Sequence, residues 1–241
     1  MKKAFTLAEV LITLGIIGVV AALVMPSLIA NYRKKQYVVQ LQKAVSVWDN
    51  AMKLMLATDG VEYFNDTEFA KAVVDTGVTS YSGSIADSSE AANILKKYLN
   101  IVKFPSDDDI YNFNCLYDRN EPDGTIWPIF MADGSAYSVN ISSLNLPPVE
   151  NLSNGVVTID VNGKKGPNQN GRDVFGFYMD RYGQLIPTNS MQAVNYGWMS
   201  SAYYWRNQTG WCGIPGSSDT TDVVGNGCAA RIMENGWVMD Y

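Results

Sequence analysis

The longest apolar segment of the chain runs from Phe5 to Ala30, and Glu9 is the one charged residue within it. From Val10 to Ala30 the segment supplies 21 residues, and a helix of about 20 apolar residues is long enough to cross the hydrocarbon of a membrane. Pro26 lacks a backbone N–H, so we expect a kink just before it. The pattern predicts a membrane-spanning helix with a carboxylate at its start.

Beyond a basic cluster at residues 33–35, apolar residues recur in steps of three and four, which is the spacing of one helix face. They are Tyr37, Leu41, Ala44, Val45, Trp48, Met52 and Met55. Asp59 and Gly60 end the pattern. We therefore expect one helix over residues 5–58, with residues 5–30 as its membrane-spanning half. Residues 31–58 form its amphipathic half, and residues 59–241 form a globular α/β head.

In the head, two short helices are expected at 67–76 and 89–99, each preceded by Asn, Asp or Ser residues that favour helix starts. Strand-like segments follow at 126–131, 135–141, 156–161, 174–179 and 184–186, separated by turn residues. Asn235-Gly236 is a strong hairpin signal, so a last hairpin is expected from 229–233 and 237–241. The predicted fold class is α+β, with the long helix packed against an antiparallel sheet.

The residues around the start of the apolar segment resemble a known pattern. Lys2-Lys3-Ala4 followed by Phe5-Thr6-Leu7-Ala8-Glu9 is similar to the leader and helix start of type IV pilins and of the pseudopilins of type II secretion. Residues 1–4 would then be a prepilin leader. The resemblance implies that a prepilin peptidase cuts between Ala4 and Phe5, that Phe5 is N-methylated, and that Glu9 guides assembly.

Two positions depart from that family pattern. Ala4 stands where the family usually has Gly, and Ala8 where a larger aliphatic residue is common. An ordinary secretory signal fits less well, because its apolar core covers only 7 to 15 residues before a small-residue cleavage site. The prepilin interpretation is therefore preferred, and it implies a pilin-like fold for the whole chain.

The function implied by the resemblance is structural, and no enzymatic activity is expected. The chain would be a single-pass protein of the inner membrane that polymerises with other pilin or pseudopilin subunits into a type IV pilus or a secretion or DNA-uptake pseudopilus. The alternative is a membrane-tethered extracellular binding or enzymatic domain with an ordinary anchor. Charge counting conflicts with a head outside the membrane, because Arg33, Lys34 and Lys35 follow the span. We place the head outside on the resemblance.

Composition removes several function classes. The formal net charge is −6, and from Gln36 onward it is −10, so nonspecific nucleic-acid binding is not expected. The chain contains no His, which excludes a Ser-His-Asp triad and His-ligated zinc within it. No cofactor is expected apart from a possible structural calcium ion.

Three cysteines, Cys115, Cys212 and Cys228, allow three single pairings or three free thiols, and sequence does not choose among them. The segment that Cys212 and Cys228 enclose is rich in Gly, Ser and Asp, and it resembles the C-terminal disulfide region of type IV pilins. That resemblance favours a bridge between Cys212 and Cys228, with Cys115 as a buried thiol.

Residues 160–173 form a segment between two expected strands that contains oxygen-bearing side chains, three glycines and a proline. Such a loop offers oxygen ligands for calcium, and the candidate ligands are Asp160, Asn162, Asn168 and Asp173. Pseudopilin heads of the major type bind calcium in a C-terminal loop, and only the general position of residues 160–173 resembles that loop. Lys164 stands where an EF-hand would have an oxygen ligand, and Gly, Asn and Asp also serve ordinary turns. A metal-free turn is the favoured interpretation.

Overall fold

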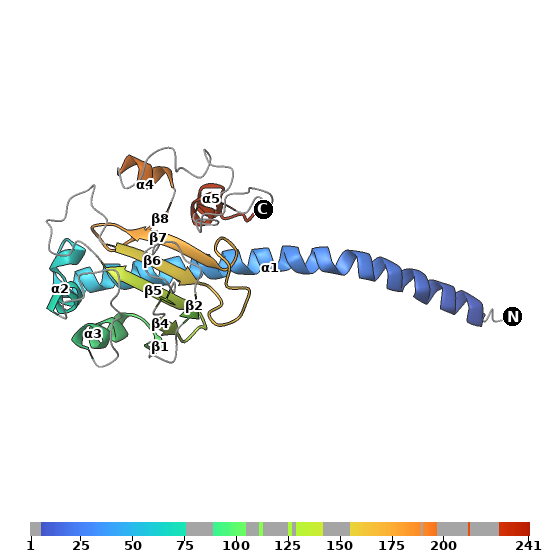
Figure 1. Ribbon diagram of the computed structural model, residues 1–241, viewed down its shortest axis with the longest axis horizontal. Coiled ribbons are helices and arrows are strands. Elements are labelled where there is room, and N and C mark those ends of the chain that lie inside the picture. The colour runs from blue at the N-terminus through green and yellow to red at the C-terminus, as the bar shows by residue number, and fades with distance from the viewer. Residues whose placement is uncertain are drawn as a thin grey trace. The chain divides into compact units, whose positions relative to one another are not determined.

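The structure is a computed structural model, and it describes residues 6–75, 89–104, 111–112, 125–126, 129–141, 155–188, 190–196, 212 and 227–241. The chain divides into two compact units, Met1–Gln36 and Tyr37–Tyr241. Each unit is described by itself. Helix α1, Leu7–Asp59, contributes its first part to the first unit and its second part to the second (Figure 1).

The predicted long helix is confirmed, and its ends differ from the expected ends by no more than two residues. Pro26 lies inside α1. Up to Gln36 the described side chains are exposed or half-exposed, whereas from Tyr37 onward one face becomes buried. The buried residues are Tyr37, Val38, Leu41, Ala44, Val45, Trp48, Ala51, Met52 and Met55. They include every residue of the predicted apolar face, so the three-and-four spacing was a sound guide to burial.

Short helices follow α1. They are the 3-10 helix η1, Phe64–Asp66, then α2, Glu68–Asp75, and α3, Glu90–Tyr98. Ser89 caps α3, because its side-chain oxygen accepts a hydrogen bond from the backbone N–H of Ala92. Thr67 does the same for α2 through the N–H of Ala70. Both helices therefore begin at short polar side chains, as the sequence predicted.

The head contains an open antiparallel sheet of six strands in the order β1-β4-β5-β6-β7-β8 (Figure 1). The strands are β1 Ile101–Lys103, β4 Ile129–Met131, β5 Ala136–Ile141, β6 Gly155–Asp160, β7 Val174–Met179 and β8 Leu185–Pro187. From β4 onward, sheet neighbours are also neighbours in sequence, which is the predicted meander. The α+β class is confirmed at this level.

Two strand predictions differ from the structure. The single strand expected at 126–131 is divided between two sheets, because β3, Thr125–Ile126, pairs with β2, Tyr111–Asn112, in a separate ribbon, while β4 belongs to the main sheet. β1 was not expected at all. It pairs with β4 through an irregular register, and three residues with two exposed side chains give little periodic signal.

The predicted C-terminal hairpin is wrong, because residues 228–234 form helix α5, Cys228–Glu234. Asn235 and Gly236 end this helix. The N–H of Trp237 donates to the carbonyl of Ile232 and that of Gly236 to the carbonyl of Met233, with Gly236 at a φ of 73°. These two bonds form a Schellman motif, in which a glycine of positive φ satisfies the last helix carbonyls. The same dipeptide that favours a hairpin turn therefore serves here as a helix end.

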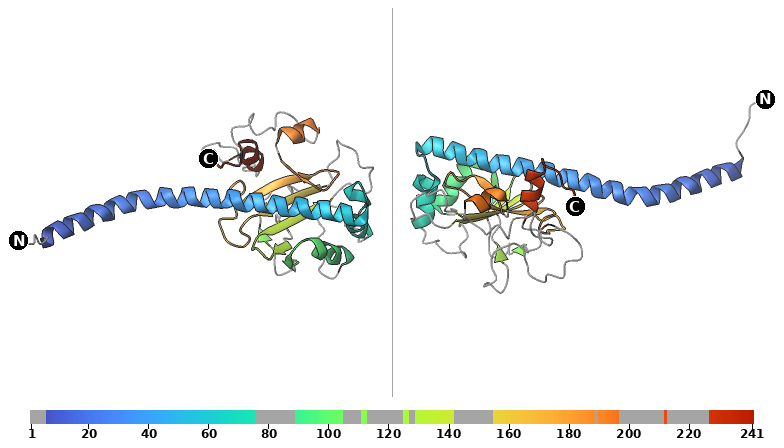
Figure 2. Two further views of the ribbon diagram at one scale, coloured as in Figure 1. Left: turned by 180° about the vertical axis from the view of Figure 1, so that it is seen from behind. Right: turned by 90° about the horizontal axis from the view of Figure 1, so that it is seen from above.

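The head core lies between α1 and the sheet, which Figure 2 shows as separate layers. The side chains of Tyr137, Val157, Ile159, Phe175 and Phe177 face the buried side of α1 and are almost completely buried. The opposite face carries a smaller apolar cluster around Tyr178 and Ile186, where α4, Met191–Asn195, packs through Ala193. The sheet therefore presents its larger apolar face to the helix.

Candidate functional site

Glu9 forms a reciprocal pair of hydrogen bonds with Thr6 at the start of α1. The backbone N–H and the hydroxyl of Thr6 donate to Glu9 Oε2 at 2.8 and 2.9 Å, and the N–H of Glu9 donates to Thr6 Oγ1 at 3.3 Å. This arrangement is a capping box, in which Thr and a Glu three residues later satisfy two backbone donors at a helix start. Glu9 therefore orders the first turn of its own helix.

Thr6, the partner of Glu9 in this capping box, was not among the predicted site residues. The signal was present, because Thr6-Leu7-Ala8-Glu9 matches the capping-box pattern of Ser or Thr followed three residues later by Glu or Gln. The other residues of the predicted processing site, Ala4 and Phe5, lie outside the described part of the chain. Cleavage and methylation there stay predictions.

The first unit presents an almost wholly apolar helix surface. From Leu7 to Ala30 the helix has one charged side chain, Glu9, and its large apolar side chains are exposed. Gly15 and Gly18 have no atoms near the position that a Cβ would occupy, so the backbone there is open to close approach by another helix. By length and composition α1 can cross a membrane.

In the head, two hydrogen bonds connect α1 to the start of β8 and the turn before it. Trp48 Nε1 donates to the carbonyl of Gly183 at 2.8 Å, and Asp49 Oδ1 accepts from the N–H of Leu185 at 3.0 Å. Asp180 Oδ1 closes the turn by accepting from the N–H groups of Tyr182 and Gln184. Burial raises the pKa of both carboxyl groups, Asp49 and Asp180. These acids hold a turn in place.

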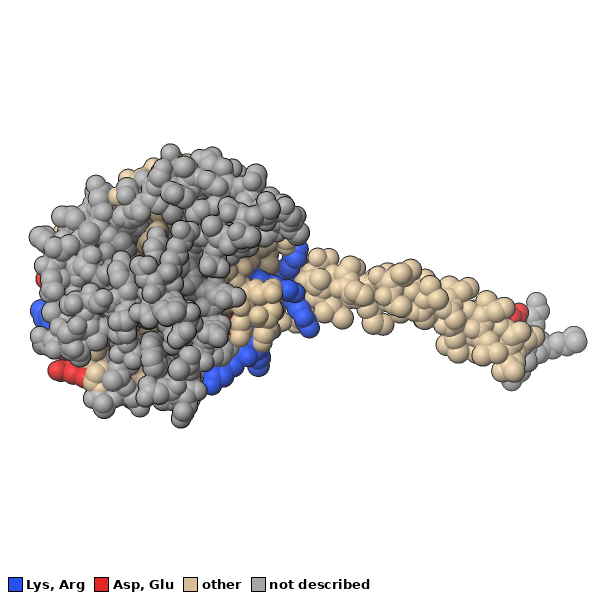
Figure 3. Space-filling view, viewed as in Figure 1, with Lys and Arg blue, Asp and Glu red and all other residues tan. Residues whose placement is uncertain are grey.

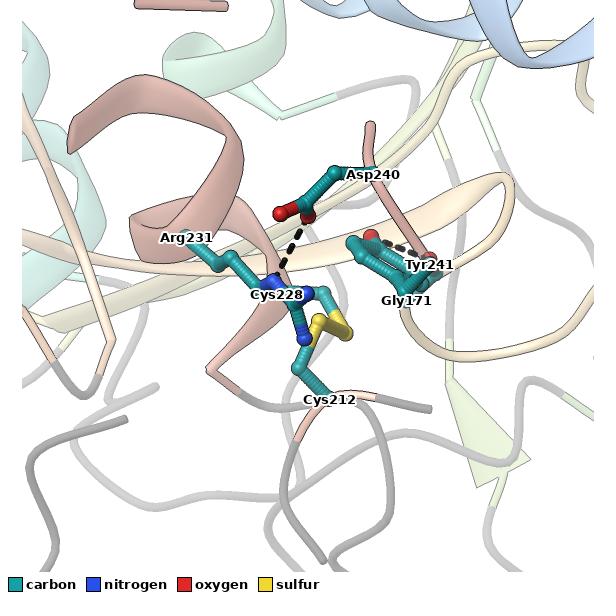
Figure 4. The surroundings of a disulfide bond; sticks show 6 residues. All are labelled: Gly171, Cys212, Cys228, Arg231, Asp240 and Tyr241. Carbon is teal, nitrogen blue, oxygen red and sulfur yellow. Dashed lines mark hydrogen bonds and ion pairs between the residues drawn. A yellow bond between two sulfur atoms is a disulfide. The ribbon is translucent and has the colours of Figure 1, made fainter. Parts of the chain in front are cut away.

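A disulfide joins Cys212 to Cys228, the pairing that the family resemblance favoured, with 4.8 Å between the two Cα atoms (Figure 4). Both residues are buried, and Cys228 is the first residue of α5. Arg231 of this helix pairs with Asp240 at 2.7 Å, and Tyr241 donates its hydroxyl proton to the carbonyl of Gly171 at 2.7 Å (Figure 4). The bridge therefore holds Cys212 to the start of α5, and the Tyr241 hydrogen bond joins the C-terminal segment to the loop between β6 and β7. Cys115 lies outside the described residues.

Reduction of this bridge is expected to lower the free energy of unfolding by about 3 kcal/mol, because it removes a closed loop of about 15 residues from the unfolded chain. Nonreducing peptide mapping of protein isolated from the cell envelope should recover the Cys212–Cys228 peptide pair. Urea unfolding of the full chain with and without reductant measures the stability change, and a Cys115→Ser variant is the control. Free thiols at both positions in the envelope protein would contradict the assignment.

The loop between β6 and β7 brings the four candidate calcium ligands together, but through N–H donors. Asp173 accepts the backbone N–H groups of Asn168 and Gln169 and the side-chain amide of Asn162, at 2.7 to 3.2 Å. Asp160 Oδ1 accepts the N–H of Asn162 at 3.0 Å. Both carboxyl groups are completely buried. Asp173 is therefore the hydrogen-bond acceptor around which the loop closes.

This arrangement does not fit calcium. Calcium takes six to eight oxygen ligands, whereas Asp173 is surrounded by N–H donors. Asn162 Oδ1 is buried without a hydrogen-bond partner, but one such oxygen falls far short of that number. Nor do three or more Asp, Glu or Cys side chains converge as a metal site within the described ranges. The three bonds to Asp173 make this segment a hydrogen-bonded turn.

Asp160 is expected to make the head less stable as the pH rises from 4 to 8. Burial, and then the nearby Asp173 carboxylate, raise the pKa of Asp160 to about 8, whereas an unfolded Asp titrates near 3.9. Between those pH values the folded chain holds a proton that the unfolded chain has lost. The stability that the protonated Asp160 contributes to the folded head is therefore complete below pH 4 and is lost by pH 8. Asp160→Asn should remove a slope of at most about 1.4 kcal/mol per pH unit. Urea unfolding of the wild type and of Asp160→Asn at pH 5, 6 and 7 measures this slope. If the unfolding free energy of both proteins depends on pH in the same way, the raised pKa of Asp160 is contradicted.

Gly163 in the same loop is expected to tolerate no side chain. Its φ is 60°, and a Cβ there would overlap the backbone carbonyl oxygen of Gly134. Gly60 is a matched control, because its φ is 67° and a Cβ would meet nothing. Gly60→Ala should cost about 1 to 2 kcal/mol from its backbone conformation alone. Gly163→Ala should cost about 1 to 3 kcal/mol more, from the overlap. Equal losses in urea unfolding would show that the loop relaxes freely.

Comparisons of the chain with models of known protein families, with curated proteins and with solved structures found no match.

Proposed function

We propose that the chain is a pilin-like structural subunit, anchored in a membrane by α1 and assembled into a filament through the apolar half of that helix. The observation that carries the proposal is the surface of α1 from Leu7 to Ala30. It is apolar, exposed within its own unit and interrupted by one carboxylate at its start. Such a surface needs lipid or other apolar helices around it.

Two further features support the proposal. The residues Lys2 to Glu9 resemble the leader and helix start of type IV pilins and pseudopilins. In addition, one continuous helix supplies both the apolar surface and the strip on which the head is built, because Trp48 and its neighbours form the head core. A subunit that polymerises through its helix needs this direct connection between assembly surface and head.

Mass spectrometry of the mature amino terminus tests the proposal. We expect the chain to begin at N-methylated Phe5. As a control, Ala4→Leu places a bulky residue where the resemblance calls for a small one, and it should leave residues 1–4 attached. An intact Met1 in the wild type, or a start near Asn31 after ordinary signal cleavage, would overturn the pilin interpretation. The chain would then be a membrane-tethered or secreted domain.

A further inference from the structure

Three consecutive basic residues, Arg33, Lys34 and Lys35, follow the apolar segment of α1, and we call them the basic collar. Arg33 and Lys35 are exposed and Lys34 is half-exposed. Figure 3 shows blue basic side chains next to the long tan surface of this helix. Tyr32, directly before the collar, is 68% exposed.

The position of the collar along the helix matches the headgroup layer of a bilayer. The 21 residues from Val10 to Ala30 span about 31 Å at 1.5 Å per residue, and the hydrocarbon core is about 30 Å thick. Arg33 lies three residues beyond Ala30, or about 5 Å further along the axis. The polar layer on each side of the hydrocarbon is about 5 to 7 Å deep, so Arg33 and Lys34 fall within it and Lys35 lies at its outer edge. Tyr32 has the amphipathic ring typical of that interface.

The collar has no countercharge of its own. The 39 residues between Glu9 and Asp49 include no Asp or Glu. Among the described residues of its own unit, 6–36, Glu9 is the one carboxylate, and it lies 24 residues before Arg33 in the sequence. The opposite charge must therefore come from outside these residues. At this depth, the abundant anion is the phosphate of a lipid headgroup.

We propose that the basic collar binds the headgroups of anionic phospholipids in the leaflet where the span ends. Arg donates forked hydrogen bonds to phosphate, and the two Lys side chains act as mobile point charges above the hydrocarbon. The inference rests on the proposed membrane anchoring but requires neither filament assembly nor a particular orientation. The basic collar would therefore bind lipid as well as mark the end of the apolar segment of α1.

Spin-label electron paramagnetic resonance of the full chain in vesicles tests the proposal. The vesicles contain phosphatidylcholine, with a trace of spin-labelled phosphatidylglycerol or phosphatidylcholine as the probe. The relative association constant should favour the anionic probe by about fivefold, taking the attraction of one basic side chain for an anionic headgroup as the scale. Arg33→Gln/Lys34→Gln/Lys35→Gln should bring this constant close to one, as should 1 M NaCl, where the screening length is about 3 Å.

The matched control is Lys53→Gln/Lys71→Gln/Lys97→Gln, which removes the same charge from exposed lysines of the head. It should keep the wild-type preference. Equal loss in both triple variants, or no preference in the wild type, would overturn the collar as a lipid site. Resistance to alkaline extraction is measured in parallel. A chain extracted by alkali has no membrane anchor, so the proposed function and this inference both fail. A chain that stays in the vesicles without lipid preference refutes this inference alone.

Discussion

Replacing Glu9 with alanine is expected to reduce incorporation into filaments strongly while leaving membrane insertion and the folded head intact. After cleavage, the new amino group of Phe5 would be a cation at the edge of an apolar helix, and a Glu9 carboxylate on a neighbouring subunit would compensate it. Removing one partner of a poorly hydrated ion pair costs about 3 to 5 kcal/mol, because the other charge stays buried alone. Such a pair would therefore act mainly by penalising incorrect registers between subunits.

The capping box gives Glu9 a second role, and two variants separate it from assembly. Glu9→Gln keeps a side-chain acceptor for the Thr6 N–H and hydroxyl but removes the charge, and Gln serves in capping boxes. Thr6→Ala removes the hydroxyl but keeps the carboxylate. If charge compensation governs assembly, Glu9→Gln should fail as Glu9→Ala does, whereas Thr6→Ala should lose only the cap, about 1 kcal/mol of helix stability.

The measurement is the ratio of filament to membrane protein for each variant at equal expression. An unchanged ratio for Glu9→Ala would make Glu9 an interfacial carboxylate with a purely local role. A Glu9→Gln variant that assembles normally while Thr6→Ala does not would assign the effect to helix capping. Both outcomes would contradict the intersubunit ion pair.

Replacing Trp48 with alanine is expected to lower the free energy of unfolding by about 3 to 5 kcal/mol. Trp48 is completely buried, and its ring stacks on Tyr137 with centroids 6.1 Å apart. Its Nε1 donates to the Gly183 carbonyl at 2.8 Å. The variant therefore opens a cavity between helix and sheet and removes a buried donor. A loss of this size is a large fraction of the 5 to 15 kcal/mol that stabilises a typical domain.

Two controls separate these contributions in urea unfolding of the full chain. Trp48→Phe keeps an aromatic ring but leaves the Gly183 carbonyl without this donor, so it should cost about 1 to 3 kcal/mol. Leu54→Ala changes a residue that lies on the same helix and is 56% exposed, so it should stay within about 0.5 kcal/mol of wild type. If Trp48→Ala and Leu54→Ala lower the free energy of unfolding by similar amounts, the burial of the Trp48 face of α1 in the head core is contradicted.

The local pattern of the sequence determined α1, the capping positions of α2 and α3, and the strands β5, β6 and β7. The three-and-four spacing in α1 specifies which face is buried, and the strands stand out as runs of β-branched and aromatic residues between turn residues. The capping box at Thr6 and Glu9 is also local, and four residues are enough to recognise it. The charge pattern likewise placed a basic cluster directly after an apolar span.

Tertiary contacts decided the rest. Asn235-Gly236 is compatible with a hairpin turn and with a helix end, and the burial of Cys228, Ala229 and Ile232 against the core selects the helix. Asp173 offered oxygens for a cation, but the folded loop directs three N–H groups at it. In both places the residue types are compatible with two local arrangements. The choice between them depends on which groups a distant part of the chain buries or hydrogen-bonds, and a local pattern carries no record of that.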